Sequence, residues 1–120
     1  MKLNPEVEEA ARILGKSLGD QEVTQHYLEA RKRVEADAEV NALEKELYTT
    51  YENLIARQQA GQQIPRDEVE AFYALRNRVF AHPLVQEREN ALQPLKSLFS
   101  EVVVEISAPL GVDYSALIEK

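Results

Sequence analysis

Apolar residues recur at intervals of three and four positions along most of the chain, a spacing that places side chains on one face of an α-helix. Asn4-Pro5-Glu6 predicts the start of the first helix. Asn can accept a hydrogen bond from a free backbone amide, Pro has no amide to leave unpaired, and the negative charge of Glu is favourable at a helix N-terminus. The stripe that follows is Val7, Ala11, Leu14 and Leu18. Gly19 is expected to end this helix in a left-handed conformation.

Two further helices are predicted before residue 61. The stripe of the first is Val23, Tyr27, Ala30 and Val34. Asp37 offers a new cap, so a break is expected near residues 35–37. The next helix runs from Val40 to Ala60 without Gly or Pro in its interior, and it carries the stripe Leu43, Leu47 and Leu54. This is the first of two long helices.

Gly61-Gln62-Gln63-Ile64-Pro65 is the clearest interruption, because Gly can take a positive φ and Pro65 forces the residue before it into an extended conformation. The chain is expected to reverse there. A helix is predicted over residues 66–81 and ends at His82-Pro83.

The second long helix begins at Pro83, with the stripe Leu92, Leu95, Phe99, Val102 and Ile106. Pro94 either kinks this helix or separates two helices. Val102-Val103-Val104 is a β-branched run, but no other segment offers a partner strand, so helix is favoured. Pro109 and Gly111 end the helix, and Asp113 can cap a last turn.

The predicted fold is therefore all-α: five or six helices, two of them long and antiparallel, in one domain over residues 1–120 that forms an elongated bundle and a dimer. Val102, Val103 and Val104 point in three directions about 100° apart, so one neighbour cannot cover them all. These valines therefore indicate a surface for self-association or for a partner, and the alternative is that they belong to a broad intramolecular core. Tyr48, Tyr51 and Tyr73 suit an interface and a core edge equally. Eleven residues form the candidate interface: Leu47, Tyr48, Tyr51, Leu54, Phe72, Tyr73, Leu95, Phe99, Val102, Val103 and Ile106.

Composition excludes several functional classes. Apolar residues make up 44% of the chain, which is typical of a globular domain rather than a disordered one. A net charge of −7 opposes polyphosphate ligands. The chain contains no Cys, which removes disulfides and thiolate ligands and suits a reducing compartment. No membrane span or signal peptide is apparent, so the protein is expected to be cytoplasmic.

No catalytic, metal or cofactor site is predicted. Neither His26 nor His82 has a Glu three residues before it, as a di-iron bundle site requires. Phosphate-binding, serine-hydrolase and zinc-hydrolase motifs are lacking, so an enzyme is not expected. An RNA-binding module that uses Arg31, Lys32, Arg33 and Arg76 is an alternative, as is a bundle that binds a small ligand.

The chain resembles the YlbF/YmcA family of small bacterial helical proteins, including the shorter YheA-like members. Three segments carry the resemblance: Leu14-Gly15-Lys16-Ser17-Leu18, the stretch from Arg57 to Pro65, and the tail from Leu98 to Ile106. The resemblance covers nearly the whole chain, although it includes no catalytic motif.

The resemblance implies an oligomeric, non-enzymatic regulatory adaptor. Studied members of the family act with YaaT on endoribonuclease Y, and so influence messenger RNA processing, competence, sporulation and biofilm formation. YaaT-like or endoribonuclease Y-like proteins are therefore the expected partners, beside a second copy of the chain. Some members use cysteines to hold an iron–sulfur cluster, and this chain has none to contribute.

Overall fold

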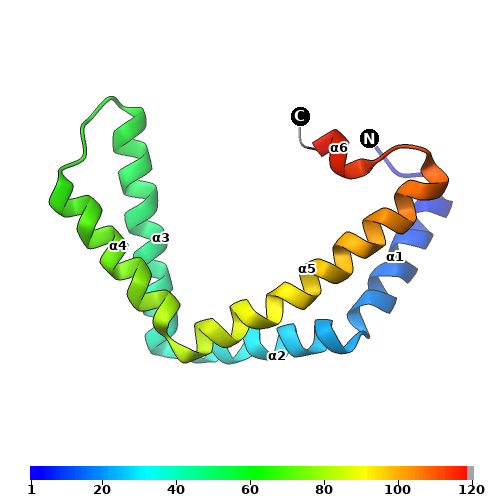
Figure 1. Cartoon of the computed structure of the whole chain (residues 1–120), viewed down its shortest axis with the longest axis horizontal. Helices are drawn as coiled ribbons and strands as arrows, with labels where there is room; N and C mark the ends of the chain where they lie inside the picture. The colour runs from blue at the N-terminus through cyan, green and yellow to red at the C-terminus, as the bar shows by residue number, and fades with distance from the viewer. Residues whose placement is uncertain (119–120) are drawn as a thin grey trace. The chain divides into compact units, whose positions relative to one another are not determined.

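The computed structural model describes residues 1–118, which form six α-helices (Figure 1). The all-α prediction is confirmed, and so are the two long helices. The helices are α1 Pro5–Gly19, α2 Glu22–Ala36, α3 Ala38–Gln59, α4 Arg66–Ala81, α5 Pro83–Leu110 and α6 Tyr114–Ile118. No helix among the described residues is long and apolar enough to cross a bilayer.

Short polar side chains start three of the helices, as the sequence predicted. The Val7 amide donates to Asn4 Oδ1 at 2.8 Å, and the Val40 amide donates to Asp37 Oδ1 at 3.0 Å. The Ser115 amide donates to Asp113 Oδ1, also at 3.0 Å. Each cap satisfies an amide that has no partner within its helix.

The end of α1 differs from the prediction. Positive φ occurs at Gly61 (84°) and Gly111 (76°) among the described glycines, and Gly19 remains helical. Side chains of α2 satisfy the last carbonyls instead: the Thr24 hydroxyl donates to the Leu18 carbonyl, and the Gln25 amide donates to the Gly19 carbonyl, each at 2.6 Å. The left-handed ending predicted at Gly19 was therefore wrong.

Helix α5 continues through both of the features that could have interrupted it, Pro94 and the valine run. It includes Pro94, which has no amide to donate to the carbonyl of Asn90, and it also includes the valine run at 102–104. Pro94 therefore does not divide the segment into two helices. The preference for helix over strand at the valine run is confirmed.

Contacts divide the chain into two compact units. Residues 29–89 form one unit, in which α3 and α4 make an antiparallel hairpin joined by the turn at Gly61 (Figure 1). Its core contains Val34, Val40, Val79 and Val85, with Leu43, Leu47 and Leu84 packed against them. The helix that packs antiparallel to the long helix α3 is therefore α4.

The second unit contains residues 1–28 and the chain from Asn90 onward, and so holds α1, most of α5 and α6. Ala91 and Leu95 are its buried residues among those described. Few large side chains are buried here, and this leaves much apolar surface in the unit exposed.

Candidate interaction surfaces

Helix α1 has an apolar stripe but no buried residue. Val7 is 48% exposed, Ile13 and Leu14 are also exposed, and Leu18 is half-buried. Helices in proteins gain most of their stability when an apolar face packs against something. The stripe of α1 therefore lacks much of the cover that such a face usually receives.

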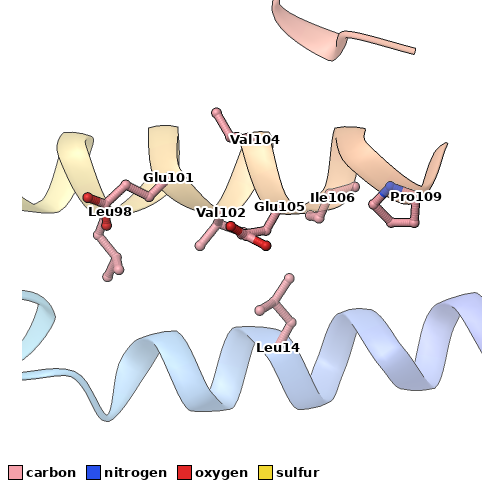
Figure 2. Close-up of a pocket in the computed structure, with 8 residues that line it drawn as sticks. All are labelled: Leu14, Leu98, Glu101, Val102, Val104, Glu105, Ile106 and Pro109. Atoms are coloured by element: carbon pink, nitrogen blue, oxygen red, sulfur yellow. The ribbon is translucent and has the colours of Figure 1, made fainter. Parts of the chain in front are cut away.

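A groove lies beside this stripe, in the same unit. We call it the α1–α5 groove; it has a volume of about 820 Å³ and a mostly apolar lining. Figure 2 shows Leu98 and Val102 pointing from α5 toward α1, Leu14 pointing back toward α5, and Val104 pointing away from α1. The residues that line it are Leu14, Leu98, Glu101, Val102, Val104, Glu105, Ile106 and Pro109.

Two carboxylates on α5 line the groove. Within residues 1–118, neither Glu101 nor Glu105 has an ion-pair or hydrogen-bond partner, and both are exposed. On α1, by contrast, Glu8 and Glu9 both pair with Arg12 at 3.1 Å. The groove thus combines exposed apolar side chains with uncompensated negative charge.

A second surface lies on the α3–α4 hairpin. We call it the aromatic face and define it by Tyr48, Tyr51, Phe72, Tyr73, Arg76 and Phe80. The Phe72 ring lies 6.0 Å from that of Tyr51 and 5.5 Å, edge to face, from that of Tyr73. The guanidinium of Arg76 lies 5.2 Å from the ring centre of Phe80. The rings of Tyr51, Phe72 and Tyr73 thus form one contiguous cluster, with the Arg76–Phe80 pair on the same helix as Phe72 and Tyr73.

Tyr48 is the most exposed member of the aromatic face, at 65%. The hydrogen bond to Glu52, and then the negative charge of that carboxylate, raise the pKa of the Tyr48 phenol. The phenol therefore stays neutral over a wider pH range. Tyrosine is common at protein interfaces because its side chain combines an apolar ring with a polar hydroxyl.

The eleven predicted interface residues lie in different environments. Leu95 is 8% exposed, so its side chain is part of the core. Leu47, Leu54, Phe72, Val102 and Val103 are half-buried, and Leu47 packs against the hairpin core. The exposed members are Tyr48, Tyr51, Tyr73, Phe99 and Ile106.

Sequence reasoning did not include Leu14, Val104, Arg76 or Phe80 in the candidate interface. Leu14 was identified only as part of the apolar stripe of the first helix. Val104 was used in the argument that one neighbour cannot cover the three valines, but it was not included in the candidate interface. The proximity of Arg76 to Phe80, four residues apart on one helix, was readable from the spacing.

Asp37, Glu39 and His82 bring three possible ligand atoms within 4.8 Å of one another. Each has a structural role at a helix start. Asp37 caps α3, and Glu39 lies in its negatively charged first turn. The Leu84 amide donates to His82 Nδ1 at 3.2 Å, so this nitrogen of His82 is engaged at the start of α5. This geometry assigns the cluster to the two helix starts.

Several arginines form ion pairs within the hairpin unit. Arg88 donates to both oxygens of Glu44, at 3.1 and 2.7 Å, and also pairs with Glu89, which together raise the pKa of its guanidinium. Arg33 pairs with Glu87. Arg31 lies 3.5 Å from Glu35. Glu35 and Glu87 thus pair with two of the four residues, Arg31 and Arg33, that the RNA-binding alternative requires.

Comparison with known proteins decides the family. A family model described as control of competence regulator ComK, YlbF/YmcA, matches residues 7–111. The chain belongs to the YlbF/YmcA family. The resemblance seen in the sequence is thereby confirmed, and the description of the family is one of regulatory proteins. No functionally curated protein matches it.

One solved structure extends the comparison to the fold of the YlbF/YmcA family. The crystal structure of Bacillus subtilis RicA in complex with RicF is similar with a TM-score of 0.75 at 20% identity. The match covers 91% of this chain and 96% of that chain. At this identity the likeness establishes a shared fold, and it does so over nearly the full length of both proteins.

Proposed function

We propose that this protein is a non-enzymatic regulatory adaptor that acts through protein–protein contacts. The observation that carries the proposal is the apolar surface of α1 and α5, which the chain itself does not cover. Exposed apolar patches of this kind mark interaction sites in soluble proteins. Two findings support it: the family is described by control of a competence regulator, and RicA, which shares the fold, was crystallised with a protein.

The regulatory pathway in the proposal comes from the family resemblance. Relatives influence endoribonuclease Y together with YaaT, so the adaptor would act in messenger RNA processing, competence, sporulation or biofilm formation. YaaT-like or endoribonuclease Y-like proteins are the partners proposed here. The cytoplasm, where such partners would be met, is the proposed location.

The proposal includes a homodimer through the aromatic face. Tyr and Arg are enriched at the energetic centres of interfaces, and Phe is enriched in interfaces generally. Sedimentation equilibrium tests this with Tyr48→Asp and a matched control, Thr49→Asp, at the adjacent exposed position. We expect a dimer mass for the unmodified chain and for the control, and a monomer mass for Tyr48→Asp. A monomeric unmodified chain, or an unchanged mass for Tyr48→Asp, contradicts the dimer.

Affinity capture tests the adaptor role. Tagged protein is recovered from a ribonuclease-treated lysate of the cells that naturally produce it, and bound proteins are identified by mass spectrometry. Ile106→Asp removes the apolar contact at a half-exposed groove position, and Thr49→Asp is the control. Circular dichroism establishes that both variants fold.

We expect the unmodified chain and Thr49→Asp to capture the same partner, and Ile106→Asp to lose it. YaaT-like or endoribonuclease Y-like partners would support the pathway taken from the family. Capture that is identical for all three proteins, or capture of the chain alone, contradicts the adaptor role.

A further inference from the structure

We propose that the α1–α5 groove binds one amphipathic helix of a partner protein, and that this helix carries two basic residues, one turn apart, that pair with Glu101 and Glu105. The inference rests on the proposed adaptor function. It adds the chemistry of the partner segment to that function.

The spacing on α5 matches a helical ligand. Leu98, Val102 and Ile106 recur every four residues along the groove, and Glu101 and Glu105 form a parallel row with the same spacing. From Leu98 to Pro109, α5 presents 12 residues, or about 18 Å at 1.5 Å per residue. A helix of three to four turns covers that length, and its own four-residue period brings an apolar row and a charged row to the same side.

The negative charge of the groove indicates that the side chains beside the apolar row of the partner helix are basic. Residues 97–118 contain no Lys or Arg. Two basic residues nearby in the sequence, Lys96 on α5 and Lys16 on α1, do not line the groove and form no ion pair among the described residues. Neither Glu101 nor Glu105 has a partner among the described residues. A partner that covers the apolar row desolvates both carboxylates in part, and cationic side chains offset that cost.

The same charges disfavour a second copy of this chain as the symmetric occupant. A two-fold interface places one patch against the identical patch of the other copy. Two grooves face to face would bring four unpaired carboxylates together, and like charges across an interface oppose association. The observations thus favour a different, basic helix.

The experiment uses displayed helical peptides as probes of the full chain. Each peptide has a fixed leucine stripe, and its flanking positions are randomised. Peptides are selected on the unmodified chain, and those that also bind Ile106→Asp are discarded. We expect the recovered peptides to carry Lys or Arg at two flanking positions four residues apart.

Charge reversal then identifies the pairing. Glu105→Lys is expected to weaken a recovered peptide about tenfold, and a Lys→Glu change in the peptide is expected to restore its affinity for that variant. Glu46→Lys, an exposed acidic position on α3, is the control for a change in total charge. Fluorescence anisotropy measures each affinity, and circular dichroism establishes folding.

Three results overturn the inference: no peptide depends on Ile106, the dependent peptides lack basic residues, or Glu105→Lys has no larger effect than Glu46→Lys. These outcomes are separate from the adaptor test. If lysate capture depends on Ile106 but the peptides fail, the adaptor function stands and the basic helix is wrong. If peptides bind as expected but the lysate provides no partner, the adaptor function fails.

Discussion

Two valines on the same helix are expected to respond very differently to the same substitution. Val85 is 0% exposed in the hairpin core, whereas Val104 is 66% exposed beside the α1–α5 groove. The change to Ala removes the same atoms at both positions. It therefore tests how far burial decides the contribution of a side chain to stability.

The cost at Val85 follows from its burial. Removing two buried methyl groups costs about 1.6 kcal/mol in transfer free energy, at about 0.8 kcal/mol for each group. The cavity left beside Val34, Val40 and Val79 adds to that cost, so Val85→Ala should lower the free energy of unfolding by about 2–3 kcal/mol.

The cost at Val104 is much smaller. About one-third of its surface is covered, so the transfer term falls to about 0.5 kcal/mol. Ala also has a helix propensity better by about 0.5 kcal/mol, which offsets the loss. The free energy of unfolding should therefore change little.

Urea denaturation followed by circular dichroism measures both values, and anisotropy with a groove-binding peptide measures affinity. We expect Val85→Ala to lose stability and keep peptide affinity under native conditions. We expect Val104→Ala to keep both stability and affinity, because Val104 points away from α1 (Figure 2). Equal losses of stability at the two positions would refute the burial argument. Lost affinity of Val104→Ala would contradict a peptide that binds along Leu98, Val102 and Ile106.

The remaining predictions concern the hairpin and the helix ends. Arg57 donates to both oxygens of Glu68, and these hydrogen bonds lower the pKa of the Glu68 carboxyl in the folded chain. The stability they provide is present above the pKa of the unfolded chain and is lost as the pH falls through the pKa of the folded chain. Glu68→Gln should therefore make the melting temperature depend less on pH on the acid side. Gly15→Ala, in open space within α1, should stabilise the chain by about 1 kcal/mol. Gly61→Ala, at a φ of 84°, should instead destabilise it by about 1 kcal/mol, and urea denaturation compares the two. Asp37→Ala removes the cap of α3 and should cost about 1 kcal/mol in the same measurement; no loss would contradict the capping role.

Helix boundaries were predictable because their signals are local. Asn4, Asp37 and Asp113 each cap an amide within three residues, and the turn at Gly61 needs a positive φ that glycine adopts easily. Gly19 shows the limit of such signals. Side chains from the next helix satisfy the carbonyls at that end, and a single glycine does not reveal them.

The candidate surfaces were less predictable, because a stripe shows that a face is apolar and not what covers it. Leu95 and Ile106 belong to one stripe of α5, yet Leu95 is buried and Ile106 is exposed. The stripe of α1 has regular spacing but contains no buried residue. Cover depends on which helices become neighbours, and that is a tertiary property.

Photo-crosslinking from the groove tests the central claim most directly. A photoreactive residue replaces Ile106, or Thr49 as the control, in the protein as expressed in its natural host, and crosslinked products are identified by mass spectrometry. We expect position 106 to crosslink to one different protein, within a helical segment rich in Lys or Arg, and position 49 to form no such crosslink. Crosslinking at position 106 to no protein, or equally at both positions, would contradict that claim.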